Sequence, residues 1–328
     1  MLRVSVCIVA YNEEKYLGDL LNDILSQTYP HKMIEIVLID SLSDDNTRKI
    51  MNAFRENHSS DFLGIKVLDN PNRIQAAGWN VAIDSYTGDV LSRIDAHTHI
   101  MPDFVEKVVH NLEQGEMIVG GQRPCIIEEQ TKWADILLRV ENSLFGSSIN
   151  PSKRESRKQY VKTVFHASYR REVFEKVGHF NESLLRTEDN EMHYRMRKKG
   201  FRICYDPEIV SYQYARSNLR KMIKQKYGNG YWIGLTTKVC PGCISIYHLI
   251  PGAFVLSIIF TSLFAALGIW QLAALMWGAY VLFCLISTFL SARHSPFNQY
   301  IFIMPFLFLI LHFAYGAGTI AGLFKRIK

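Results

Sequence analysis

The last quarter of this 328-residue chain limits the possible folds more than any other part. Residues 249–324 are overwhelmingly apolar, with one short polar break at residues 292–296. Roughly 20 consecutive apolar residues are enough to cross the hydrocarbon core of a bilayer. Three stretches have about that length: Ile250–Trp270, Leu272–Ala292 and Tyr300–Leu323. Helices that are apolar on every side have no face for water, so we expect a membrane domain at residues 249–328 with about three transmembrane helices.

The segment before these stretches, residues 216–248, is basic. It holds much of the positive charge that gives the chain a net charge of +6, on these side chains: Arg216, Arg220, Lys221, Lys224, Lys226 and Lys238. Anionic lipid head groups attract lysine and arginine beside a membrane. A nucleic-acid site would need a basic stripe interleaved with aromatic residues away from the membrane, and the sequence has none. We therefore expect an interfacial juxtamembrane segment, with the membrane and no nucleic acid as a partner.

The N-terminus bears on cellular location. Residues 4–10 are apolar but too few for the core of a signal peptide, and Asn12-Glu13-Glu14 follow without a small-residue cleavage site. We therefore expect no secretory signal peptide. The first domain should stay in the cytoplasm, and the C-terminal helices should attach it to the cell (inner) membrane as a multi-pass protein.

Residues 1–215 alternate between strand and helix patterns. Apolar runs bounded by turn residues predict buried strands at residues 4–10, 34–40 and 65–68, and apolar residues at helical spacing predict helices at residues 17–25 and 75–83. Strands that alternate with helices are typical of the α/β class. The sequence therefore predicts an α/β domain with a mostly parallel sheet.

Polar residues stand directly after the predicted strands: Tyr11, Asp40, Arg73 and Asp95. The carboxyl ends of parallel strands meet at one edge of such a sheet, where ligands bind. We therefore predict a nucleotide pocket at this edge. The first strand is not followed by Gly-x-Gly-x-x-Gly and no Gly-Lys-Ser/Thr loop is present, which argues against a dinucleotide site and against a P-loop NTPase.

Asp95, His97 and His99 lie within five residues at the end of a predicted strand. Carboxylate and imidazole groups could hold a hard divalent cation such as Mg, Mn or Zn. The alternative is a loop with solvated histidines. Asp189, after Thr187 and Glu188, also has two interpretations. It could be an acid in the first turn of a helix capped by Thr187, or a general base that points into the cleft.

Five motifs follow one another in the first domain: Val-Ala-Tyr-Asn-Glu-Glu at 9–14, Ile-Asp-Ser-Leu-Ser-Asp-Asp-Asn-Thr at 39–47, Asn-Arg-Ile-Gln-Ala-Ala-Gly-Trp-Asn at 72–80, Asp-Ala-His at 95–97 and Thr-Glu-Asp at 187–189. In this order and spacing, over residues 4–214, the chain resembles an inverting family 2 glycosyltransferase with a GT-A catalytic domain. Within that family it is most similar to the membrane glucosyltransferases of succinoglycan-type exopolysaccharide biosynthesis.

The resemblance implies roles for individual residues. Tyr11 and Asp40 would hold the nucleobase, Arg73 would lie near the base or the phosphates, and Asp95 would contact the ribose or a metal. The full set implied to bind the nucleotide sugar is Ala10, Tyr11, Glu13, Asp40, Arg73 and Asp95.

The resemblance also implies a divalent cation, Mg or Mn, held by Asp95 and His97. Asp189 would be the catalytic base that deprotonates the acceptor hydroxyl. Three further residues are expected on the acceptor side or in support of the site: Glu188, His166 and Trp232.

Two departures from the family qualify this picture. His97 stands where the metal-binding aspartate usually lies, so the site has one negative charge fewer. Residues 225–232 lack the Gln-x-x-Arg-Trp spacing of processive synthases, which favours transfer of a single sugar.

The function implied is transfer of a hexose from a nucleoside-diphosphate sugar, with a UDP-sugar expected, to a lipid-linked saccharide at the cytoplasmic membrane face, in exopolysaccharide or other surface glycan synthesis. One alternative is transfer to a polyprenyl phosphate. An alternative of another class is a non-catalytic membrane subunit that binds a sugar nucleotide.

Overall fold

The protein is described by a computed structural model. It describes residues 1–143, 145–146, 157–216, 218–293 and 295–325. The chain forms two compact units, the first from Met1–Pro124 with Pro151–Gln213 and the second from Cys125–Asn150 with Tyr214–Lys328.

The first unit is an α/β domain. Its strands are β1 Val4–Ala10, β2 Ile34–Asp40, β3 Gly64–Asp69, β4 Val90–Asp95, β5 Thr98–Ile100, β6 Ile118–Gln122, β8 Gln159–Val161, β9 Phe165–Arg170 and β10 Ile203–Tyr214, which ends at the boundary of the unit. Its helices are α1 Leu17–Leu25, α2 Thr47–His58, α3 Gln75–Ser85, α4 Phe104–Glu113, α6 Arg171–Val177 and α7 Glu188–Lys198.

The strands of this unit form one mixed sheet in the order β3-β2-β1-β4-β9-β6-β10-β5, with β8 paired to β10. Strands β3, β2, β1 and β4 run parallel, as the alternating sequence pattern predicts. The rest of the sheet departs from that pattern, because β9 runs antiparallel to both of its neighbours. The predicted α/β class is confirmed, and its parallel half holds the strand ends of interest.

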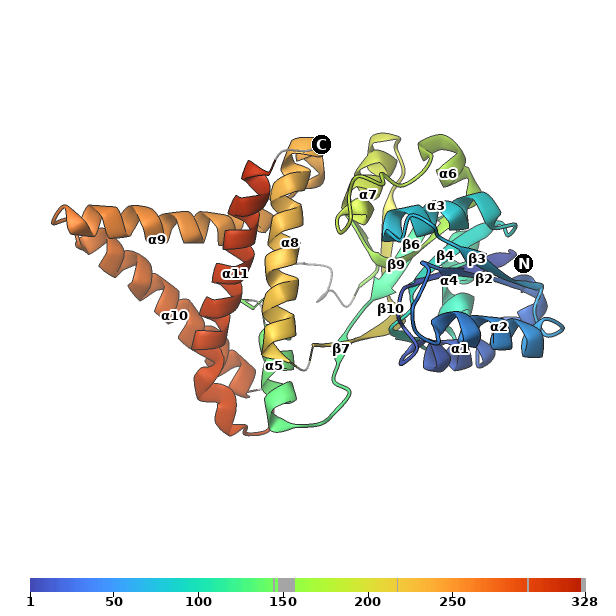
Figure 1. Ribbon diagram of the computed structural model, residues 1–328, viewed down its shortest axis with the longest axis horizontal. Coiled ribbons are helices and arrows are strands. Elements are labelled where there is room, and N and C mark those ends of the chain that lie inside the picture. Colours follow the sequence, from blue (N-terminus) through green and yellow to red (C-terminus); the bar gives the residue numbers. More distant parts are fainter. Residues whose placement is uncertain (144, 147–156, 217, 294, 326–328) are drawn as a thin grey trace. The chain divides into compact units, whose positions relative to one another are not determined.

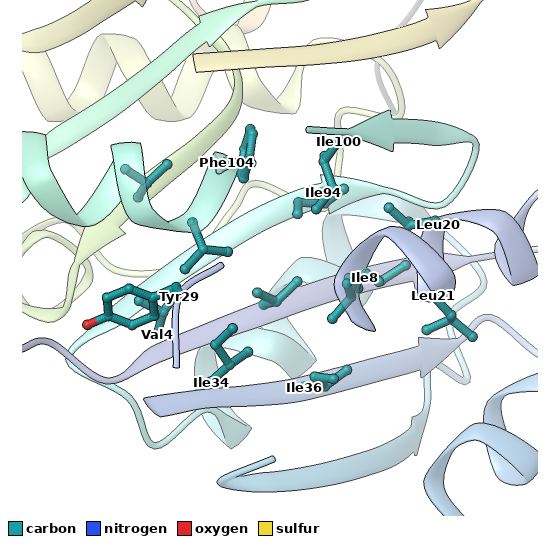
Figure 2. Close-up of a cluster of buried hydrophobic side chains, with 14 of the residues drawn as sticks. Val4, Ile8, Leu20, Leu21, Tyr29, Ile34, Ile36, Ile94, Ile100 and Phe104 are labelled. Atoms are coloured by element: carbon teal, nitrogen blue, oxygen red, sulfur yellow. The ribbon is translucent and has the colours of Figure 1, made fainter. Parts of the chain in front are cut away.

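Helices cover both faces of the sheet (Figure 1). Alternate residues of β1 and β2 point to opposite faces, as a strand requires. Val4, Val6 and Ile8 join the core beneath α1, α2 and α4, whereas Cys7 joins the core beneath α3, α6 and α7. Figure 2 shows the first of these cores, where Ile8, Ile34 and Ile36 lie with Leu20 and Leu21 of α1.

The second unit is helical. It contains the short strand β7 Cys125–Ile126, the helices α5 Lys132–Asn142, α8 Leu219–Val239, α9 Ile250–Ala266, α10 Gln271–Arg293 and α11 Met304–Phe324, and the 3-10 turns η3 Pro241–Cys243, η4 Ile246–Leu249 and η5 Gln299–Ile303. Cys240 and Cys243 form a disulfide. Three segments of the described chain are long and apolar enough to cross a membrane: Ile246–Ala266, Gln271–Arg293 and Gln299–Phe324. The three apolar helices predicted from the sequence are therefore present.

Helices α8 and α11 lie against each other along their length (Figure 1). Their contact is made by glycines spaced four residues apart. A Cβ added at Gly230 of α8 would lie 1.9 Å from the carbonyl oxygen of Tyr315, and one added at Gly318 of α11 would lie 2.2 Å from that of Tyr227. Gly234 and Gly322 meet the opposite backbone in the same way. Small residues at this spacing let two helix backbones approach closely.

Polar contacts attach α5 to the other helices of this unit. Lys226 of α8 is buried and lies 2.8 Å from a carboxylate oxygen of Glu141 on α5. Asn298 donates to Asp135 of α5 at 2.7 Å. Helix α5 therefore groups with the C-terminal helices, although the motifs of the first domain lie on both sides of it in the sequence.

Candidate functional site

The carboxyl ends of three parallel strands lie side by side. In the register of the sheet, Ala10 of β1 is opposite Asp40 of β2, and Val9 of β1 is opposite Asp95 of β4. The strands end where polar loops begin, so Asp40 and Asp95 flank the end of β1 from its two sides. The structure thus brings Ala10, Asp40 and Asp95 together at one sheet edge.

The loops after β1 and β2 are tied to each other. The Asn12 amide donates to Ser43 Oγ at 3.0 Å, the Asp44 amide donates to Asn12 Oδ1 at 2.8 Å, and the Glu13 amide donates to Thr47 Oγ1 at 2.8 Å. Asn12 has a φ of 55°, in the left-handed region that side chains other than glycine rarely adopt. Such a conformation persists where its surroundings determine it, and it is common at functional sites.

Tyr11, Asp44 and Arg73 form an exposed group above this edge. Tyr11 Oη donates to Asp44 Oδ2 at 3.3 Å, and the Arg73 guanidinium lies 6.0 Å from the centre of the Tyr11 ring. Tyr11 is 46% exposed, whereas Asp40 is buried and accepts a bond from the Ser43 amide at 3.2 Å. An open aromatic face beside a cation, with a buried carboxylate below, can stack a base and accept a hydrogen bond from it.

Asp95 is surrounded by donors and cations. Its Oδ2 lies 3.3 Å from His166 Nε2 and 3.8 Å from Arg123, and its Oδ1 lies 4.0 Å from Arg93. Burial alone would raise the pKa of Asp95, but the hydrogen bond and charge of His166, followed by the charges of Arg93 and Arg123, outweigh it and hold that pKa well below its usual range. Asp95 is therefore an anion.

His166 lies directly behind Asp95. It is buried, its φ is 45°, and its Nδ1 lies 2.7 Å from Ser211 Oγ. Burial lowers the pKa of His166, and the nearby Asp95 opposes that effect. His166 thus contacts the carboxylate side of the site, and its predicted supporting role stays a proposal.

His97 is held between two side chains. Its Nδ1 lies 3.0 Å from Glu13 Oε1, and its Nε2 lies 3.3 Å from the side-chain amide of Gln213. A carboxylate on one ring nitrogen is the usual way to orient a histidine that binds metal through the other. His99 is instead engaged by Asp23 at 2.9 Å. His99 is thus tied to α1 and is not gathered with His97 into one ligand set.

The possible metal ligands at this edge of the sheet, Asp95 and His97, suit a cation that takes most of its ligands from a substrate. In the part of the chain that the structure describes, no group of three or more His, Cys, Asp or Glu side chains is placed to hold a metal ion. Asp95 and His97 provide two ligand types at the end of one strand. Mg²⁺ is commonly bound by one or two protein carboxylates together with substrate phosphates. These residues fit that arrangement and do not fit an all-protein metal site.

The start of α7 brings a second pair of carboxylates to the site. Glu188 is 2% exposed and accepts a bond from Arg93 at 3.2 Å. Burial raises the pKa of Glu188 to about 7, the charge of Asp189 acts in the same direction, and Arg93 opposes both. Thr187 occupies the N-cap position, but its side chain makes no capping bond, so the simple capping explanation of this motif lacks its main contact.

Asp189 is partly exposed at this helix start. Its Oδ1 accepts a bond from the adjacent Asn190 amide at 2.8 Å. It therefore stands next to a protonatable buried acid and remains open on one side. That combination can receive a proton from a group that enters the site.

Three contributors to this site were not predicted from the sequence: Arg93, Arg123 and Gln213. Arg93 had a detectable signal, because a charged residue inside the apolar run of β4 requires a buried partner. Arg123 directly follows β6 and Gln213 lies in β10, both far away in the sequence, and neither had such a signal. Trp232 lies on α8 in the second unit, with its ring against Tyr231. Its predicted role on the acceptor side remains a prediction.

A mixed sheet of this kind, with an acidic row at its parallel end, is the GT-A fold. The profile described as glycosyl transferase family 2 matches residues 5–178, and that of glycosyl transferase family group 2 matches residues 92–321. The chain therefore belongs to glycosyl transferase family 2 and is a glycosyltransferase, as its motifs predict.

Two curated relatives span nearly the whole chain. It is 28% identical over 98% of its length to dolichyl N-acetyl-alpha-D-glucosaminyl phosphate 3-beta-D-2,3-diacetamido-2,3-dideoxy-beta-D-glucuronosyltransferase of Methanococcus voltae, of which 97% is covered. It is 25% identical over 95% of its length to the succinoglycan biosynthesis protein ExoA of Rhizobium meliloti, of which 92% is covered. The predicted similarity to succinoglycan enzymes is confirmed.

Solved structures support the fold. The mannosyltransferase PcManGT from Pyrobaculum calidifontis, in complex with GDP-Man and Mn2+, superposes with a TM-score of 0.64 at 18% identity, covering 97% of this chain and 87% of that one. TarS 1–349 of S. aureus, in complex with UDP-GlcNAc, superposes with a TM-score of 0.51 at 17% identity, covering 70% of this chain and 66% of that one.

Proposed function

We propose that this glycosyltransferase moves a hexose, with inversion, from a nucleoside-diphosphate sugar to a lipid-linked saccharide at the cytoplasmic face of the cell membrane. The observation that carries the proposal is the row formed by Ala10, Asp40 and Asp95 at one sheet edge. Asp189 stands beside this row at the start of α7, because Glu188, the first residue of α7, accepts a bond from Arg93 of β4, the strand that ends at Asp95. A donor pocket and a candidate base thus belong to one unit.

The nucleotide would lie over the loops after β1 and β2. In this proposal the base stacks on the Tyr11 ring beside Arg73, and Asp40 accepts a hydrogen bond from a base N–H. Ala10 and Glu13 line the turn between them, and Asp95 faces the ribose and diphosphate. A UDP-sugar is the proposed donor, and the solved structures that share the fold hold UDP-GlcNAc in one case and GDP-Man in another.

Asp95 and His97 would hold a divalent cation, Mg or Mn, together with the diphosphate of the donor. When bound, such a cation stabilises the negative charge that develops on the leaving nucleoside diphosphate. Glu13 orients His97 through the contact at Nδ1. The two guanidinium groups and the imidazole around Asp95 keep it ionised before any donor arrives.

Asp189 would act as the general base. A sugar hydroxyl is a weak nucleophile until a carboxylate accepts its proton in the transition state. In this proposal the hydroxyl attacks the anomeric carbon from the face opposite the leaving group, the bond to the diphosphate breaks, and the proton moves to an Asp189 oxygen. Glu188, buried beside it, supports the base from the protein side.

The acceptor side of the proposal rests on the second unit and on the relatives. The names of the two relatives that span the chain refer to a dolichyl-linked sugar phosphate and to succinoglycan biosynthesis. Three segments long enough to cross a membrane would hold the enzyme beside such a lipid. We propose a multi-pass protein with domains at residues 1–215, 216–248 and 249–328, in which Trp232 and the exposed basic residues Arg220, Lys221 and Lys224 of α8 face the lipid.

The test is a transfer assay on the purified full-length protein in lipid nanodiscs. Radiolabelled UDP-glucose, UDP-N-acetylglucosamine and GDP-mannose are each offered with an extract of lipid-linked saccharides or with synthetic polyprenyl phosphate. Label in the saccharide lipids supports the proposal. Label only in polyprenyl phosphate would replace the acceptor class, and nucleotide binding without any transfer would indicate a non-catalytic subunit.

A further inference from the structure

Arg93 occupies an unusual position for a charged residue. It lies within β4, a strand whose other residues up to Ile94 are buried, and it is itself only 9% exposed. A buried guanidinium must find partners, because an unpaired charge in the protein interior costs several kcal/mol. Arg93 finds them on two different elements. Its NH2 group lies 4.0 Å from Asp95 on its own strand and 3.2 Å from Glu188 at the start of α7.

Two aromatic rings enclose the same guanidinium. The Arg93 Cζ lies 4.5 Å from the ring centre of Trp79, which is almost fully buried on α3, and 5.7 Å from that of Phe180, in the segment between α6 and α7. A planar guanidinium packed against rings has little freedom to rotate. Its direction toward Asp95 and Glu188 is therefore fixed by packing as well as by charge.

We propose that Arg93 is a positioning residue that sets the distance between the donor end of the site at Asp95 and the base at Asp189. The proposal rests on the function proposed above. Glu188 is adjacent to Asp189 in the first turn of α7, so whatever holds Glu188 also places Asp189. Displacement of a reacting group by about 1 Å can cost about a hundredfold in rate.

A second arginine–glutamate pair provides a comparison within the same helix. Arg195 bonds to Glu191 at 2.7 Å and donates to the carbonyl oxygens of Val177 and His179. It attaches α7 to the end of α6 and touches neither Asp95 nor Glu188. If Arg93 only stabilised the fold, replacement of Arg93 and of Arg195 would have the same kind of effect.

The experiment compares R93M, R93K and R195M with the wild type as full-length proteins in nanodiscs. Transfer is measured with the donor and lipid that the wild type uses in the assay above, and thermal unfolding is measured in parallel. We expect R93M to lower kcat at least tenfold with donor KM within threefold. R93K should restore the melting temperature but not kcat, because a flexible ammonium cannot reproduce the planar guanidinium that packs against Trp79 and Phe180. R195M should lower the melting temperature and leave kcat within twofold.

A double-mutant cycle with E188Q sharpens the test. The losses in kcat for R93M and E188Q should be non-additive, because both break the same link. The positioning role would be overturned if R93M and R195M lost kcat equally and in proportion to their loss of melting temperature. It would also be overturned if R93M changed the donor KM and left kcat unchanged. Absence of transfer by the wild type would instead refute the proposed function and remove the basis of this role with it.

Discussion

The first unit, built on the β-sheet, and the second, helical unit differ in how their elements pack internally. In the sheet unit, aliphatic side chains such as Ile8 and Ile36 fill the space between strands and helices. In the helical unit, α8 and α11 meet where side chains are absent, at Gly230 and Gly318. Small residues at these positions let the two helix backbones approach closely. One unit should be sensitive to removed atoms and the other to added atoms.

The units also differ in where they bury polar groups. In the sheet unit, Arg93 and Glu188 are buried beside Asp95 at the carboxyl end of the parallel strands. The helical unit buries the ion pair between Lys226 and Glu141 where α8 meets α5. Ionisable residues within apolar helix bundles usually pair with one another. The first arrangement belongs to the candidate site, whereas the second joins helices.

The largest effect is expected at Asp189, which tests whether the chemistry belongs to the sheet unit. Asp189→Asn keeps the size of the side chain but removes the proton acceptor. Turnover should fall by at least about a hundredfold, with donor affinity nearly unchanged. Initial rates of transfer and calorimetric titration with UDP measure the two quantities.

Asp84→Asn is the matched control for that variant. Asp84 is a surface residue near the end of α3 that pairs with His179, and its loss should leave turnover unchanged. Wild-type turnover in Asp189→Asn, together with a lower melting temperature, would assign Asp189 a structural role in the first turn of α7.

A smaller effect is expected for Ile36→Ala, which creates a cavity in the sheet core. Ile36 is fully buried on β2. Loss of a buried isoleucine side chain to alanine typically costs about 2–5 kcal/mol, whereas Ile36→Val should cost about 0.5–1.5 kcal/mol. Hydrogen exchange of β2 amides measures the loss, and the exchange of α11 amides should not change. Equal acceleration in both elements would show that the two units unfold together.

The corresponding change in the helical unit adds a methyl group. Gly230→Ala should separate α8 from α11 at a cost of about 1–3 kcal/mol, because its Cβ would meet the carbonyl oxygen of Tyr315. Gly278→Ala on α10 is the control, since nothing lies within 4 Å of a Cβ at that position. The control should be neutral or slightly stabilising. Detergent unfolding followed by circular dichroism distinguishes them, and equal stability of the two variants would contradict close packing at Gly230.

The smallest expected effect is a pH dependence confined to the sheet unit. Burial would raise the pKa of Glu35, but bonds from Lys66, Ser5 and Thr87 outweigh it and lower that pKa. The folded state thus binds a proton less readily than the unfolded state. The resulting stability is fully present above the ordinary value of 4.5 and is lost as pH falls through the lower folded-state pKa.

Glu35→Gln tests this sign. In the variant, the exchange of β2 amides should depend less on pH below 4.5 than in the wild type. The amides of α8 and α11 should respond alike in both proteins. An unchanged acid dependence of β2 in Glu35→Gln would show that other carboxylates determine it.

Much of the sheet unit could be predicted because its signals are local. The apolar run of residues 4–10 is bounded by polar residues on both sides, and β1 occupies those residues. The acids that follow β2 and β4 meet at one edge because parallel strands point the same way. The three long apolar helices needed only their length and composition.

What could not be predicted depends on contacts between distant residues. Strand β9 pairs with β4 in the antiparallel direction, so that Val90 lies opposite Arg170. No local pattern in the sequence predicts this pairing. Helix α5 belongs with the C-terminal helices through Asp135 and Glu141, which appear in the sequence as ordinary surface acids. The pairing of Arg93 with Glu188 likewise could not be predicted from the sequence, because it depends on the packing of α7 against β4.

The register of the three central strands limits how sequences of this kind can diverge. Ala10 is aligned with Asp40, and Val9 with Asp95, because β1 pairs residue by residue with β2 and β4. One residue inserted into β2 would turn Asp40 toward the opposite face of the sheet. Insertions and deletions should therefore accumulate in the loops beyond the carboxyl ends of the strands, where they change the ligand that is bound, and at the opposite edge of the sheet, while the strand lengths themselves stay constant.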